Sequence, residues 1–158
     1  MQQHDKPAEM RKHYGRLAVM IVLSFISMYI LMYAMVDRFQ NVHPSLNQAY
    51  MAGLMTAPMV SIELLLMGMM YQQRQWNLAI LVASLVIGVA CFAAIRQQFL
   101  IGDREFLRSM IPHHSGALLM CGKAPITDPE LKQLCGTIIQ GQQAEIDQMN
   151  AMLAKPLR

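Results

Sequence analysis

The amino-acid sequence predicts an all-α membrane protein, in which three transmembrane helices precede an outward-facing helical hairpin. Three long apolar runs stand at about residues 17–36, 50–70 and 76–95. The remainder of the chain, from about residue 102, is more polar and has the apolar spacing of helices. No segment shows the alternating pattern of a β-strand. We therefore expect three regions: an N-terminal segment (1–16), a membrane domain (17–96) and a hairpin domain (102–158).

The composition excludes several classes of protein. Of the 158 residues, 54% are hydrophobic and only 15% are charged, whereas an average soluble domain has about 25% charged residues. A disordered chain or a nucleic-acid-binding domain would carry more charge, and a net charge of +3 indicates no polyanionic partner. Three cysteines are too few for a disulfide framework. The unusual feature is methionine, which occurs sixteen times.

The first and third apolar runs have the length and composition of retained transmembrane helices. Residues 17–36 contain no charged side chain, and at about 1.5 Å per residue they span about 30 Å, the thickness of a bilayer's hydrocarbon core. This run is too long for a buried core helix, and it lacks the cleavage site of a signal peptide. The third run begins at Trp76 and is followed by Arg96, and both residue types are typical of a membrane interface.

The middle run, residues 50–70, is predicted to be the second span, with a kink near Pro58. Glu63 lies within it, and a carboxylate at membrane depth usually faces a partner helix or a cavity. Three methionines repeat at intervals of four residues: Met51, Met55 and Met59. This stripe resembles that of the Ctr-type copper transporters, although it drifts by about 40° per step. Copper conduction along this stripe and Glu63 is therefore one alternative function, and methionine-rich packing without any metal is another.

Basic residues predict a cytoplasmic N-terminus. Four of them precede the first span: Lys6, Arg11, Lys12 and Arg16. The two loops between the spans carry only Arg38 and Arg74. By the positive-inside rule the N-terminus faces the cytoplasm, and three crossings place the hairpin on the outer side. We therefore expect a protein of the bacterial inner (plasma) membrane whose hairpin is periplasmic or extracellular.

Residues 102–158 are predicted to form two antiparallel helices joined by a short loop. The first helix is expected to run from an N-cap at Asp103 to about Cys121, and the second from a capping box at Thr127 to about Leu153. Two helices bury little surface by themselves. We therefore expect a homo-oligomer, a dimer or larger, that completes a four-helix bundle.

One face of each helix is expected to pack against the other. On the first helix this face contains Phe106, Met110, His113, His114, Ala117, Met120 and Cys121, within an arc of about 120°. A short loop would bring Cys135 level with His114, and Glu145 level with Glu105. Cys121 and Cys135 would then lie about 9 Å apart along the hairpin axis, which is too far for an easy disulfide. We expect these cysteines to be core residues or secondary metal ligands.

Two thioethers, two imidazoles and a thiol on one helical face indicate a soft-metal site. Sulfur ligands select Cu(I), imidazole also suits Cu(II) and Zn(II), and zinc alone would not explain the methionines. The alternative is that methionine fills the core while His113 and His114 bond to the backbone or to Gln142. His43, in the loop after the first span, has no evident partner and is expected to be solvated or interfacial.

The segment from Asp103 to Met120, with its Met-x-x-His-His core, resembles the opening helix of domain-of-unknown-function family 305. The resemblance continues on the second helix in Ile138, Ile139, Gln143, Glu145, Ile146 and Met149. It implies a ferritin-like helical fold that binds copper in the periplasm, for sequestration, resistance or transfer. By this resemblance the metal ligands are Met110, His113, His114, Met120, Met149 and Met152. The residues expected to support them are Gln142, Gln143 and Glu145.

The sequence indicates no catalytic site. Ferritin-like oxidases use Glu-x-x-His pairs, but here Glu145 is followed three residues later by Gln148, and Glu130 by Gln133. There is no phosphate-binding glycine loop and no nucleophile elbow. We therefore expect a protein that is not an enzyme, has copper as its ligand and no organic cofactor, and contacts lipid but not nucleic acid.

Overall fold

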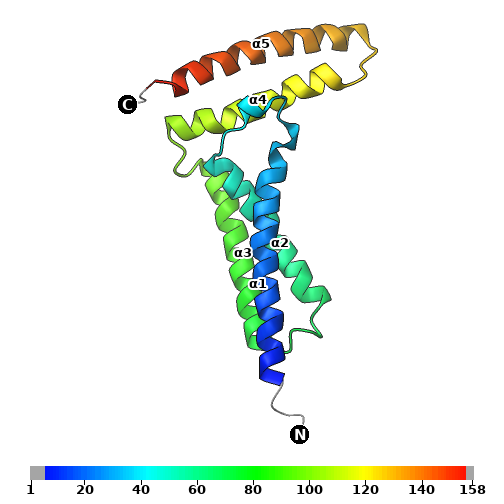
Figure 1. The fold of residues 1–158 in the computed structure, drawn as a ribbon, viewed down its shortest axis with the longest axis vertical. Helices are drawn as coiled ribbons and strands as arrows, with labels where there is room; N and C mark the ends of the chain where they lie inside the picture. Colours follow the sequence, from blue (N-terminus) through cyan, green and yellow to red (C-terminus); the bar gives the residue numbers. More distant parts are fainter. Residues whose placement is uncertain (1–5, 156–158) are drawn as a thin grey trace. The chain divides into compact units, whose positions relative to one another are not determined.

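The computed structural model describes the backbone of residues 6–155 and the side chains of residues 12–155. Within this range the chain is all-α and contains no β-strand (Figure 1), so the prediction of an all-α chain is confirmed. The elements are α1 (Lys6–Leu31), the 3₁₀ helices η1 (Met32–Met35) and η2 (Phe39–Asn41), α2 (Leu46–Leu66), α3 (Arg74–Gln97), α4 (Asp103–Lys123) and α5 (Pro129–Leu153).

Three helical segments are long and apolar enough to cross a membrane. They are Lys12–Met35, Leu46–Leu66 and Arg74–Gln97. Large apolar side chains on them are widely exposed, among them Leu23 and Leu85, and an exposed apolar surface of this extent marks an interaction with lipid or protein. The middle segment has the lowest hydropathy and is the most buried of the three.

The chain divides into two compact units. The helical unit contains α1, α3 and the part of α2 that begins at Ala49. The hairpin unit combines the segment Met32–Gln48 with the chain from Leu100 onward, which includes α4 and α5. The two hairpin helices therefore share one compact unit with the segment that follows the first apolar helix.

Polar side chains lie near the end of α2, where Glu63 contacts one of them. Glu63 lies one turn before the last residue of α2, and its Oε1 accepts a hydrogen bond from the Tyr71 hydroxyl at 3.3 Å. The Tyr14 hydroxyl donates to Asn77 Oδ1 at 2.7 Å, and the rings of Tyr14 and Tyr71 lie 5.4 Å apart. The Glu63 carboxylate therefore has a polar neighbour, which reduces the cost of its burial.

Small side chains allow α2 and α3 to pack closely. A Cβ atom at Gly88 would lie 3.2 Å from the Cβ of Ala57. One turn further along the pair, the hydroxyls of Ser61 and Ser84 are 3.0 Å apart and share a hydrogen bond. Close approach and interhelical hydrogen bonds of this kind stabilise helix pairs in apolar surroundings.

The caps of the hairpin helices differ by one residue from the prediction. Gly102 is the N-cap of α4, so Asp103 is the first helical residue. Asp128, not Thr127, is the N-cap of α5, because its Oδ1 accepts the Leu131 amide at 2.9 Å. Pro129 then occupies the first turn, where its missing N–H costs nothing.

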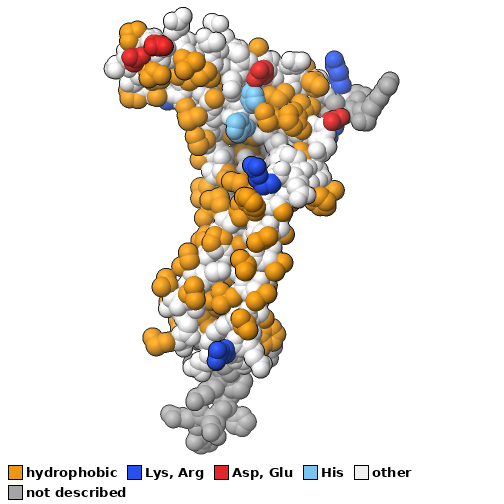
Figure 2. Space-filling model, turned by 180° about the vertical axis from the view of Figure 1, so that it is seen from behind, with side chains coloured by type: hydrophobic (Ala, Val, Ile, Leu, Met, Phe, Trp, Pro, Cys, Tyr) orange, Lys and Arg blue, Asp and Glu red, His pale blue; other side chains and the backbone are white. Residues whose placement is uncertain are grey.

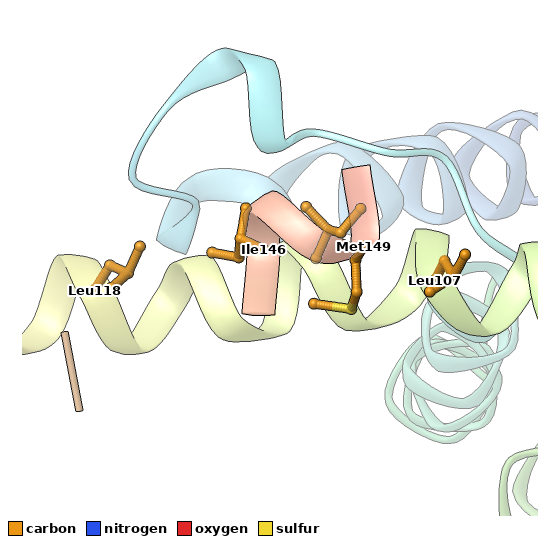
Figure 3. Packing of buried hydrophobic residues seen from close by; sticks show 5 residues of the cluster. Leu107, Leu118, Ile146 and Met149 are labelled. Carbon is orange, nitrogen blue, oxygen red and sulfur yellow. The ribbon is translucent and has the colours of Figure 1, made fainter. Parts of the chain in front are cut away.

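The core of the hairpin unit lies between α4 and α5. It consists of Leu107, Ile111, Leu118, Ile146 and Met149. Figure 3 shows Leu107 and Leu118 on α4, with Ile146 and Met149 of α5 between them along the helix. Ile111 and Ile146 are almost completely buried.

The buried face of α4 is rotated from the predicted one, because the helix is covered on two sides. Phe106, His113 and Met120, expected in the interface, are exposed. Ser115 is buried instead, and its hydroxyl accepts the Asp37 amide at 2.8 Å. A Cβ atom at Gly116 would lie 3.6 Å from the Met35 carbonyl oxygen. The segment after α1 therefore covers a second face of α4.

Asp37 anchors this segment. Its carboxylate accepts hydrogen bonds from the Ser115 hydroxyl and, at 2.8 Å, from the Asn41 amide. Desolvation raises the pKa of Asp37, but the hydrogen bonds from Ser115, Asn41 and the Arg38 backbone outweigh it and lower the pKa below its ordinary value. The carboxylate is therefore held ionised at neutral pH.

Candidate metal centre

An open groove of about 420 Å³ lies between α4 and α5 of the hairpin unit. Its polar and sulfur-bearing lining includes Met110, His114, Glu145, Gln148, Met149 and Met152. On the face seen in Figure 2, histidine side chains lie among hydrophobic side chains. The structure therefore brings together four of the six predicted ligands, namely Met110, His114, Met149 and Met152.

Helical periodicity explains why these residues share the groove. Met110 and His114 are four residues apart on α4, and Glu145 and Met149 are four residues apart on α5. Residues at this spacing lie one above the other on the same face of a helix. Met152 follows Met149 by three residues and extends the same face.

His114 lies between two hydrogen-bond acceptors. Its Nε2 is 2.9 Å from Glu145 Oε2, and its Nδ1 is 3.0 Å from the carbonyl oxygen of Met110. A neutral imidazole has only one N–H and can satisfy only one of these oxygens. The other nitrogen then requires a second proton or a metal ion. With 12% of its side chain exposed, His114 has little water to serve instead.

Three methionines line the same groove as this imidazole. Met149 is buried, Met110 is partly buried against the core, and Met152 is 42% exposed. Sulfur favours Cu(I), whereas imidazole and carboxylate also suit Cu(II). The donor set of the groove is therefore chemically suited to both oxidation states of copper.

His113 and Met120 lie outside the groove. His113 is exposed, and its ring centre is 6.1 Å from that of His114. Met120 is 53% exposed. Among the described side chains, no three His, Cys, Asp or Glu residues are placed to hold a metal ion. A metal site in the groove consequently depends on methionine sulfur.

Cys121 and Cys135 form a disulfide, so the prediction that they lie too far apart is wrong. Cys121 is two residues before the end of α4, whereas Cys135 is six residues after the start of α5. The extended loop carries the chain past the end of α4 before α5 begins, which shifts the register of the hairpin. The same shift places Glu145 opposite His114 instead of Glu105. As a disulfide, the two sulfurs are not thiolate ligands.

Gln142 and Gln143, which were expected to support the metal ligands, do not line the groove. The Nε2 of Gln143 donates to Asp147 Oδ1 on its own helix at 2.9 Å. The Oε1 of Gln142 is buried without a hydrogen-bond partner among the described atoms. Gln142 is therefore not the partner of His114, whose nitrogens face Met110 and Glu145 instead.

His43 is partly buried in the hairpin unit, contrary to the expectation that it is solvated or interfacial. Desolvation and the charge of Arg108 lower its pKa, against the effect of a hydrogen bond with Asn150. Its Nε2 is buried without a partner among the described atoms. The sequence carried no signal for this, since Asn150 is more than a hundred residues away.

The methionines of α2 have different surroundings. Met51 and Met55 are about two-fifths exposed on the surface of the helical unit. Met59 is partly buried and lines a groove with α1, while Glu63 bonds with Tyr71.

Comparison with known proteins relates most of the chain to one protein and its C-terminal part to one family model. A family model described as "Domain of unknown function (DUF305)" matches residues 91–153, which contain α4, α5 and the groove. The uncharacterized protein L153 of Acanthamoeba polyphaga mimivirus is 34% identical over 141 residues, covering 87% of this chain and 90% of that protein. No solved structure matches.

Proposed function

The chain belongs to the family of the mimivirus protein L153 and carries a DUF305 domain at its C-terminal end, and from this premise we propose that it is a membrane-anchored copper-binding protein. The binding site is the groove between α4 and α5. Copper is the cargo of this site, held for sequestration, resistance or transfer.

The placement of His114 between two acceptors is the observation that carries the proposal. When Nδ1–H of a neutral His114 donates to the Met110 carbonyl, Nε2 carries no proton. A metal ion can then bind to Nε2. The same ion offsets the charge of Glu145. The thioethers of Met110, Met149 and Met152 then make the site selective for a soft metal.

Donors from both helices favour a copper ion that links α4 to α5. Met110 and His114 come from α4, and Met149 and Met152 come from α5. His113 and Met120 are exposed outside the groove, where they are accessible to a metal ion held between two copies of the chain. A homo-oligomer therefore remains part of the proposal.

The proposed location is a membrane, with the hairpin unit on its outer side. The three apolar helices support membrane insertion, and the basic residues before the first span support a cytoplasmic N-terminus. The disulfide supports an oxidising surrounding for the hairpin, since cytosolic thiols are kept reduced.

Copper titration of the purified full-length protein tests the proposal. We expect stoichiometric Cu(I) binding, measured by competition with a chromophoric chelator and by metal analysis. His114→Ala should weaken it at least tenfold, since loss of even a supporting residue costs about 10–100-fold. His113→Ala is the matched control, because its imidazole is adjacent in sequence but outside the groove.

Circular dichroism shows whether each variant is folded. Absence of copper binding by the wild type would overturn the copper proposal. Unchanged affinity in folded His114→Ala would exclude the groove as the site.

A further inference from the structure

A second groove lies in the helical unit, between α1 and α2, and has a volume of about 420 Å³. Met20 and Met28 of α1 and Met59 of α2 line it, together with Ser24 and Ser27. Arg16 is the first lining residue along α1, and Met28 is the last. The groove is thus mainly apolar along its length and has a cation at one end.

The lining chemistry favours an apolar occupant over a metal ion. Methionine sulfur is the only common metal ligand among the described lining residues, which include no imidazole, thiol or carboxylate. The Met20 sulfur already accepts a hydrogen bond from the Ser24 hydroxyl at 3.4 Å. Methionine side chains are flexible and adapt their shape to apolar partners. They therefore provide a surface that a flexible hydrocarbon chain can fill.

The length of the groove matches a single leaflet of a bilayer. Arg16 and Met28 are twelve residues apart, about 18 Å along a helix. One leaflet is half of the roughly 30 Å hydrocarbon core, about 15 Å. A membrane-spanning helix of a second copy would follow α1 through the full thickness, whereas a lipid chain ends at the midplane.

Arg16 supplies the charge that selects the occupant. Its side chain is exposed and forms no ion pair with any described side chain. A guanidinium group binds phosphate oxygens in a bidentate way. α1 is also the least buried of the three apolar segments, with 6% of its window buried against 33% in α2. An occupant of the groove would therefore add substantially to the contacts of α1.

We infer that this groove binds one anionic phospholipid, with its phosphate at Arg16 and one acyl chain between Met20, Met28 and Met59. The lipid comes from the leaflet that holds the N-terminal end of α1, and it fixes α1 against α2. The inference rests on the proposed membrane insertion, but it is independent of copper binding.

The experiment reconstitutes the full-length protein in vesicles that contain phosphatidylglycerol and phosphatidylcholine in equal amounts. Flotation of the vesicles first tests insertion. Native mass spectrometry then identifies the lipids retained by the protein. We expect one retained phosphatidylglycerol per chain, and Arg16→Gln should reduce the preference over phosphatidylcholine about fivefold, the effect of one basic residue near an anionic membrane surface.

Arg74→Gln is the charge control, because Arg74 is exposed like Arg16 and does not line the groove. Ser27→Phe fills the groove without a change in charge and should abolish retention of the lipid. Val22→Phe is its size control, since Val22 is 55% exposed on the same helix and lies outside the groove.

Different failures separate the two proposals. Failure to float would overturn membrane insertion and this inference with it. A protein that floats but retains no preferred lipid would overturn the inference alone. Equal loss in Arg16→Gln and Arg74→Gln, or a lipid still retained by Ser27→Phe, would show that the lipid binds elsewhere.

Discussion

His114 and Glu145 meet across the groove of the hairpin unit, with Nε2 and Oε2 2.9 Å apart. The contact joins α4 to α5 through two residues that are 31 positions apart in the sequence. The two side chains differ greatly in exposure, with 12% of His114 and 59% of Glu145 accessible. The carboxylate is therefore the more accessible of the two groups, and the copper proposal predicts that an arriving ion meets it before it meets the imidazole.

Replacing this carboxylate should weaken copper binding. Glu145→Gln keeps the shape of the side chain but removes its charge, so we expect a loss of about 10–100-fold in affinity, as for other groups adjacent to a metal ligand. Glu130→Gln, in the first turn of the same helix and outside the groove, is the control. Equal affinities for the two variants, measured by chelator competition, would remove Glu145 from the site.

The disulfide should leave a single reactive thiol. Cys91 is the free cysteine, and Cys121 is bonded to Cys135. We expect alkylation of denatured, unreduced protein to add one label per chain, and three labels after reduction, by intact-mass measurement. Three labels without reduction would contradict the disulfide.

Removal of the disulfide should destabilise the hairpin unit. Closing a loop of about 15 residues contributes about 3 kcal/mol in the chain-entropy model, and here the two cysteines are 14 residues apart. Cys121→Ser with Cys135→Ser should therefore lower the free energy of unfolding by about that amount, measured by denaturant titration with circular dichroism. Cys91→Ala provides a cysteine variant outside this unit.

The anchor at Asp37 should make stability depend on pH in the acid range. The pKa of Asp37 is lower in the folded protein than its ordinary value of 3.8. Its contribution is therefore fully present well above pH 3.8 and is lost as the pH falls through the lower, folded pKa. Asp37→Asn should reduce this acid sensitivity, measured by thermal melts between pH 2 and 7, and an unchanged pH dependence would contradict the anchoring role of Asp37.

The buried hydroxyl that holds Asp37 can be tested separately. Ser115→Ala leaves the carboxylate without one of its donors, and an unsatisfied buried group costs about 1–3 kcal/mol. Ser109→Ala is a suitable comparison, because Ser109 is on the same helix and only partly buried. Similar free energies of unfolding for the two variants would show that the Asp37–Ser115 contact contributes little.

The sequence predicted the helical elements well because their signals are local. Long apolar runs specified α1, α2 and α3. α1 nevertheless extends from Lys6 to Leu31 against a predicted run of 17–36, and α2 begins and ends four residues before the predicted run of 50–70. Loop and capping residues placed α4 and α5 to within a few residues. The i, i+4 spacing also placed Met110 beside His114 correctly, since helical periodicity determines both positions.

The register of α4 against α5 could not be predicted from such local signals. The predicted register placed Cys135 opposite His114, but the structure joins it to Cys121. A loop residue can advance the chain by up to about 3.3 Å and a helical residue by only about 1.5 Å. The geometry of five loop residues therefore decides which side chains meet along the whole hairpin.

By itself, the sequence determined an all-α chain with three apolar helices, a C-terminal hairpin and a methionine- and histidine-bearing face. Only the tertiary structure decided that His114 meets Glu145, that His113 and Met120 lie outside the groove, and that the segment Met32–Gln48 covers α4. The physical reason is that hydrophobic periodicity specifies which face of a helix is buried only when one partner covers it. α4 packs against both α5 and the segment Met32–Gln48, so its buried face differs from the face predicted for a single partner.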